Sequence, residues 1–150
     1  MRFLRALGAW FAGGVAGYIA AALASQAVVL AGLAQLGLGI SLADGAGSLS
    51  HAVLNMPFYL IVILLGFAIA FFIARQVKRV APASIHAIAY PLAGATAIAA
   101  ALGLMHRQFG VFPILGAQET YGLILQIAAG AVGGFVFEAL RPKAELSSAE

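Results

Sequence analysis

The sequence predicts an all-α fold, an integral membrane four-helix bundle of transmembrane helices with both termini on the cytoplasmic side. Hydrophobic residues make up 63% of the 150 positions and charged residues 9%, whereas a soluble domain carries about 25% charged residues. A soluble fold of this size could not bury so much apolar surface. Apolar stretches also approach the roughly 20 residues that a helix needs to cross the bilayer. The length is that of one domain, so we expect a single transmembrane domain.

The first apolar stretch covers about residues 7–36. Its start, with Arg2 and Arg5 before an apolar run and Ala22 to Ala24 within it, resembles a secretory signal peptide. The apolar run continues through Leu30, however, which is too long for a signal core. We therefore expect a retained first helix. Because it is longer than the bilayer is thick, it should tilt or project beyond the membrane.

The other three spans cover about residues 53–74, 85–105 and 120–140, and residues 144–150 form a polar cytoplasmic tail. An unclosed strand would leave main-chain groups unpaired in lipid, so each span is predicted to be helical. Pro91 lies inside the third span and lacks a main-chain donor, so we expect it to kink that helix.

The basic residues predict the orientation of the chain. Seven of the eight stand next to the ends of the spans, on one predicted side: Arg2, Arg5, Arg75, Lys78, Arg79, Arg141 and Lys143. The loops on the other side carry only Arg107. Since positive residues stay on the cytoplasmic side, both termini should be cytoplasmic, and the composition is compatible with a bacterial inner membrane. No basic face with interleaved aromatics lies outside the spans, which argues against nucleic-acid binding.

Small residues at four-residue spacing indicate where helices approach one another. The first span has Gly13, Gly17 and Ala21 on one line, and the fourth has Gly130 and Gly134. Without a hydrophobic drive between helices in lipid, such lines favour close contact. We expect spans one, three and four to pack closely and span two to face lipid with more of its surface. The glycines of the fourth span are equally compatible with a homodimer seam.

Gln126 is the deepest polar side chain in the predicted spans. A polar group in the membrane is costly, so each one is a candidate site. The structural interpretation is a hydrogen bond between helices, with Gln26 or Gln35 of the first span as partner.

Glu138 and His86 lie near the predicted cytoplasmic ends of the fourth and third spans. Glu138 stands three residues before Arg141, a spacing that favours an ion pair on one helix face. The alternative is a proton relay, in which the imidazole of His86 works with the carboxylate.

The predicted outer side gathers imidazoles and carboxylates that suit a divalent transition metal: Asp44, His51, His106 and Glu119. The two histidines are also candidate axial ligands of a haem. No pair of the four has helical metal-ligand spacing, so scattered surface residues are the competing interpretation.

The sequence contains no catalytic or phosphate-binding motif, resembles no family in its functional residues, and has no cysteine. Helix-contact residues are plentiful and reactive groups few. The leading hypothesis is therefore a non-catalytic accessory subunit that packs against other membrane proteins or copies of itself within the lipid bilayer. A small transporter, flippase or channel acting as an oligomer is the second hypothesis. A haem- or metal-binding redox protein is the third.

Overall fold

The computed structural model describes residues 2–37, 47, 57–110 and 119–141. Among these residues it contains the long helices α1 (Arg2–Gln35), α3 (Pro57–Val80), α4 (Ala89–Phe109) and α5 (Thr120–Leu140). A short 3-10 helix, η1 (Ala83–Ile85), precedes α4. Each long helix has the length and apolar composition needed to cross a membrane. The predicted all-α membrane bundle is confirmed.

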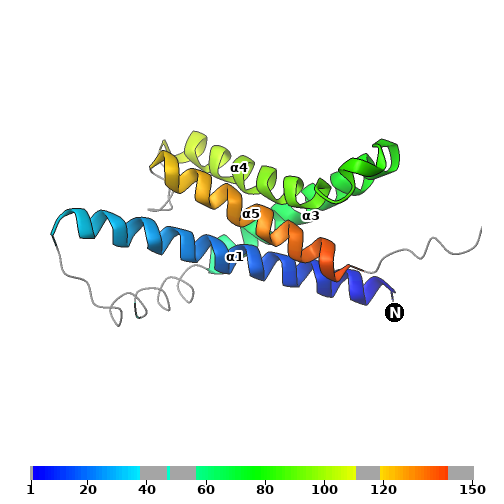
Figure 1. Cartoon of the computed structure of the whole chain (residues 1–150), viewed down its shortest axis with the longest axis horizontal. Helices are drawn as coiled ribbons and strands as arrows, with labels where there is room; N and C mark the ends of the chain where they lie inside the picture. The colour runs from blue at the N-terminus through cyan, green and yellow to red at the C-terminus, as the bar shows by residue number, and fades with distance from the viewer. Residues whose placement is uncertain (1, 38–46, 48–56, 111–118, 142–150) are drawn as a thin grey trace, which may run out of the picture.

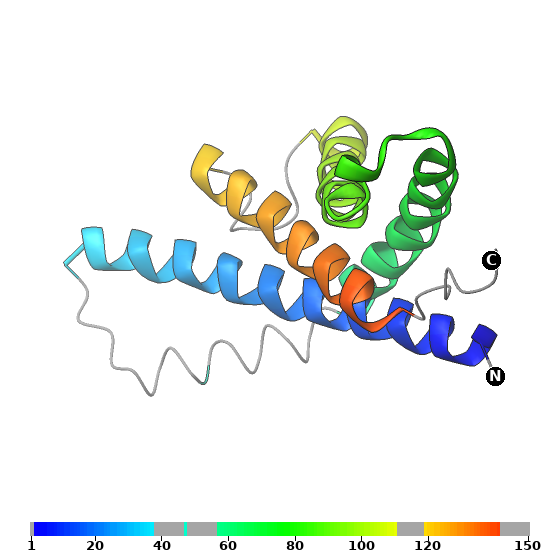
Figure 2. The same cartoon turned by 45° about the vertical axis from the view of Figure 1, so that its right-hand side comes forward.

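Figures 1 and 2 show how the four long helices are arranged. α5 lies between α1 and α4, and α3 closes the bundle by contacting both α4 and α1. The most extensive contacts are those of α5 with α1 and α4, and the least extensive of these four pairs is α1 with α3. The three spans that were expected to pack closely therefore do so. α4 nevertheless leaves as large a share of its span exposed as α3 does.

One end of the bundle collects most of the positive charge. The start of α1, the end of α5 and the turn between α3 and α4 all lie at the same end in Figure 1. We call this the basic end, and it carries Arg5, Arg75, Lys78, Arg79 and Arg141. Many large apolar side chains on the outward faces are more than half exposed, among them Phe58, Leu65, Phe72 and Phe135. Such surfaces are stable against lipid rather than water.

Several helix bounds differ from the expectation, and two of them lie at the basic end. α3 continues to Val80, beyond the apolar run, because its last turn contains Lys78 and Arg79, which interact favourably with the helix C-terminus. α4 begins at Ala89 instead of near residue 85, and Ile88 is its N-cap. Pro91 is thus in the first turn, where its missing N–H would have no helical partner in any case. Pro91 therefore interrupts no main-chain hydrogen bond inside α4, which was the ground for expecting a kink.

Glycines make the close contacts between helices. A Cβ at Gly13 of α1 would lie 2.8 Å from the carbonyl oxygen of Gly133 in α5. A Cβ at Gly130 of α5 would lie 2.9 Å from the carbonyl carbon of Gly94 in α4, and one at Gly134 would overlap the Tyr90 carbonyl. These glycines therefore let main chain touch main chain across both interfaces of α5.

Phe67 anchors α3 in the centre of the bundle. Its side chain is fully buried. The ring fills a notch between α1 and α5, since a Cβ at Gly17 would lie 3.1 Å from the ring and a Cβ at Gly133 would lie 2.5 Å from it. Ala21, on the same face of α1 as Gly17, is also fully buried. A larger residue at either glycine would displace the ring.

Candidate functional site

The first polar feature is a buried network around Gln126, which we call the amide network. The Nε2 atom of Gln126 donates to the carbonyl oxygen of Ala21 at 2.9 Å and to Oγ of Ser25 at 2.6 Å. Its Oε1 accepts from the hydroxyl of Tyr59 at 3.1 Å. Gln126 is completely buried, so an unpaired amide here would be costly. The network joins α1, α3 and α5.

The partners of Gln126 differ from those that the sequence suggested. Both N–H groups of its amide are taken by Ala21 and Ser25. Gln35 is exposed and lies ten residues beyond Ser25, about 15 Å further along α1. The predicted hydrogen bond between helices is present, with Ala21, Ser25 and Tyr59 as partners, and Gln35 is too far along α1 to take part.

The second feature is an ionic cluster at the basic end, formed by Lys78, Glu138, Arg141 and Tyr90. Arg141 donates to both carboxylate oxygens of Glu138, from Nε at 2.7 Å and from a terminal nitrogen at 2.8 Å. Lys78 of α3 donates to the same two oxygens at 3.2 and 3.3 Å. The Glu138–Arg141 pair has the spacing expected from the sequence, whereas Lys78 adds a bond between α3 and α5.

Both cations of this cluster lie over the ring of Tyr90, which is 3% exposed. The Lys78 ammonium is 4.8 Å and the Arg141 guanidinium 5.0 Å from its ring centroid, both within the range of cation–π attraction. Phe137 of α5 packs edge-on against the ring, at 4.8 Å between centroids. The hydrogen bonds to Glu138 raise the pKa of Arg141, so its guanidinium stays charged.

His86 is half-buried beside the cluster, but its imidazole bonds to the main chain and not to Glu138. Its Nε2 lies 3.0 Å from the carbonyl oxygen of Ala81. Its own carbonyl oxygen accepts a 2.6 Å hydrogen bond from Lys78. The contact between His86 and the cluster therefore runs through the main chain. The geometry lacks the imidazole–carboxylate contact that the predicted proton relay needs.

The predicted metal site is only partly within the described residues. His106 and Glu119 are exposed, at the end of α4 and just before α5. Asp44 and His51 lie outside the described residues, as does the predicted tail 144–150. Within the described part of the chain, no three His, Cys, Asp or Glu side chains are grouped so that they could hold a metal.

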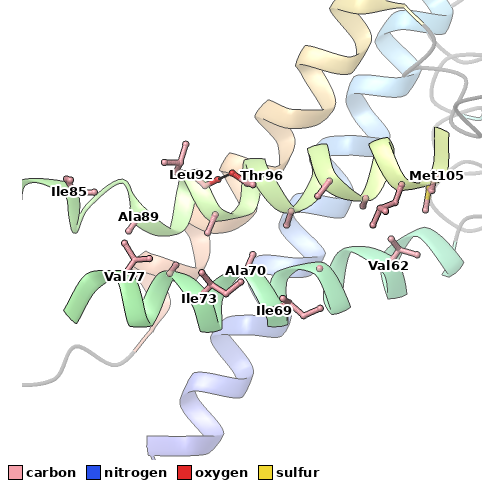
Figure 3. Close-up of a pocket in the computed structure, with 17 residues that line it drawn as sticks. Val62, Ile69, Ala70, Ile73, Val77, Ile85, Ala89, Leu92, Thr96 and Met105 are labelled. Atoms are coloured by element: carbon pink, nitrogen blue, oxygen red, sulfur yellow. Dashed lines mark hydrogen bonds between the residues drawn. The ribbon is translucent and has the colours of Figure 1, made fainter. Parts of the chain in front are cut away.

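The third feature is an apolar groove between α3 and α4, with a volume of about 620 Å³. Figure 3 shows the two helices side by side along it, with lining side chains from both. Small residues line it at four-residue spacing: Gly66, Ala70 and Ala74 of α3, and Ala93, Ala97 and Ala101 of α4. The one lining side chain with a polar group is Thr96, whose hydroxyl donates to the Leu92 carbonyl of its own helix at 2.8 Å.

Sequence reasoning missed this groove. The four-residue spacing of its small residues was the available signal, but α4 is rich in small residues on every side. Which of its lines faces α5 and which faces α3 depends on the rotation of the helix. Comparisons of the chain with protein families, with curated proteins and with solved structures found no match.

Proposed function

We propose that this protein is a non-catalytic membrane subunit that binds a transmembrane helix of another membrane protein in the groove between α3 and α4. The observation that carries the proposal is a contrast between helix-contact residues that are used inside the bundle and helix-contact residues that line the groove. Gln126 and Glu138 are bonded to neighbouring helices, and the glycines of α5 contact α1 and α4. The groove, in contrast, is lined by residues of the segment from α3 to α4 alone, many of them small.

The chemistry of the groove suits a helix. Small residues allow a second backbone to approach closely, which is how helices associate in lipid. The groove extends from Val62 to Val77 on α3. These 16 residues correspond to about 24 Å of helix, most of the roughly 30 Å hydrocarbon layer. A partner helix would therefore contact the groove across most of the bilayer. The basic end would lie on the cytoplasmic side of the cytoplasmic membrane.

The two alternative hypotheses have less support. A transporter, flippase or channel would use Gln126 or Glu138 to meet a substrate, but both side chains are already bonded between helices. For a haem or metal protein, no three His, Cys, Asp or Glu side chains of the described residues are grouped so that they could hold a metal.

Site-specific crosslinking tests the proposal, and the absence of cysteine from the sequence makes it simple. Ala70→Cys places a single thiol in the groove, and Ala68→Cys places one on an exposed side of α3 outside it. A thiol-attached photocrosslinker at position 70 should give a covalent adduct with one defined membrane protein in native membranes, and the crosslinker at position 68 should not.

A groove-filling variant provides the control. Ala101→Leu in the Ala70→Cys background adds bulk on the opposite wall and should abolish the adduct, whereas Leu at the exposed Ala68 should leave it intact. Adducts with lipid alone, or equal protein adducts at positions 68 and 70, would contradict helix binding in the groove. An adduct with a second copy of this chain would contradict a separate partner and would show that the groove is the interface of a homodimer.

A further inference from the structure

Among the described residues, positive charge at the basic end exceeds negative charge. Among the described residues, Glu138 is the one carboxylate at this end, and the other, Glu119, precedes α5 at the opposite end. Arg141 and Lys78 share Glu138 as counter-charge. Arg75 is exposed and makes no ion pair or hydrogen bond within the described part of the chain.

The excess charge converges on one place rather than being spread over the end of the bundle. Arg141 and Lys78 lie over the ring of Tyr90, and Arg75 stands three residues, about one helical turn, before Lys78 on the same side of α3. Three cations, two on α3 and one at the C-cap of α5, thus gather near a single described carboxylate, Glu138. Segregation of positive residues to one side of a membrane requires charge at this end, but it does not require this convergence.

The donors of the three cations are not equally available. An ammonium has three N–H groups, and Lys78 directs its own toward Glu138 and the carbonyl of His86. Arg141 uses two of its five N–H groups on Glu138. All five of Arg75 are free of partners among the described residues. Arg75 and Arg141 therefore present guanidinium donors, and Lys78 holds Glu138 in place.

We propose that Arg75 and Arg141 bind the phosphate group of an anionic phospholipid at the basic end of the bundle. Guanidinium groups match phosphate oxygens in pairs of hydrogen bonds. The site lies at the ends of α3 and α5, the depth of the lipid headgroups, where basic pockets between transmembrane helices bind such lipids. Phe72, three residues before Arg75 on α3 and 64% exposed, offers apolar surface to the acyl chains. This proposal does not depend on the groove or its occupant.

Native mass spectrometry of the full chain in neutral detergent measures this binding. Titration with phosphatidylglycerol should give at least fivefold tighter binding than titration with phosphatidylcholine. Arg75→Ala should weaken phosphatidylglycerol binding about fivefold, the effect of one cation near a lipid surface. Arg75→Lys should restore part of it. Arg107→Ala, which removes an exposed cation at the end of α4 far from the cluster, should change nothing.

Two further arms separate lipid binding from other roles of the cluster. Glu138→Gln removes the competing carboxylate and should strengthen phosphatidylglycerol binding, whereas a purely structural cluster would bind lipid no better. Inorganic phosphate at the same concentrations should not saturate the site. Equal binding of the two lipids, no effect of Arg75→Ala, or saturation by inorganic phosphate would overturn the proposal.

Discussion

The interface between α4 and α5 and the interface between α3 and α4 contain the same kinds of small residues, with opposite results. A Cβ at Gly130 would lie 2.9 Å from the carbonyl carbon of Gly94, so α4 and α5 touch through their main chains. A Cβ at Gly66 of α3 would lie 3.6 Å from the Cβ of Ala97, an ordinary contact. Large neighbours such as Ile69 and Leu92 stand beside the second interface and leave the groove. Small residues close an interface only where no large residues beside them hold the helices apart.

Exchanging glycine for alanine in each interface should show the largest difference. Gly134→Ala places a methyl group on the main chain of Tyr90, so we expect a loss of about 3 kcal/mol in the free energy of unfolding. Gly66→Ala fits the available space and favours the helix, so stability should stay within about 1 kcal/mol of the native value.

Unfolding in denaturing detergent, followed by the fluorescence of Trp10, the one tryptophan in the sequence, measures both variants. Trp10 is packed against the core, so its emission should report loss of the bundle. Equal destabilisation by the two substitutions would show that the interfaces do not differ as described.

A second comparison replaces one polar residue of the amide network and one polar residue of the groove. Gln126→Leu removes three hydrogen bonds and leaves the hydroxyls of Tyr59 and Ser25 without their amide partner. At about 0.6 kcal/mol per bond in a membrane, we expect a loss of about 2 kcal/mol. Thr96→Val in the groove removes only a bond to the carbonyl of its own helix, and should cost less than about 0.5 kcal/mol. Similar losses in the same unfolding assay would argue that the amide network adds no stability.

The smallest expected effect concerns the end of α3. Lys78→Met removes the bonds from α3 to Glu138 and to the carbonyl of His86, but Arg141 still pairs with Glu138. A partly exposed ion pair is worth about 1 kcal/mol or less, so we expect a loss of about that size. Hydrogen exchange at the last turns of α3 should rise, with α5 unchanged. Equal increases in both helices would show that Lys78 supports the whole bundle and not α3 alone.

The four spans are predictable because hydrocarbon thickness sets their length and charged residues bound them. The fourth agrees closely with residues 120–140, since Glu119 and Arg141 flank it. The end of α3 is less predictable, because its helix continues past the apolar run into the basic residues. Pro91 shows the same limit, since its effect depends on whether it falls in the first turn of a helix or in its interior.

The candidate sites divide in the same way. The pair of Glu138 and Arg141 follows from spacing on one helix. The partners of Gln126 depend on the rotation and offset of α1 against α5, which no local pattern specifies. The groove depends on which lines of small residues face each other across α3 and α4. Local chemistry is therefore visible in the sequence, and pairings between helices are not.

The main-chain contact of Gly94 with Gly130 has a consequence for movement. No side chain lies between α4 and α5 at this point, so no change of rotamer can let one slide past the other. α3 instead contacts its neighbours through side chains, with the buried ring of Phe67 held in the notch at Gly17 and Gly133 as its fixed point. We expect α4 to be the fixed wall of the groove and α3 the mobile one, so an arriving helix should tilt α3 about Phe67.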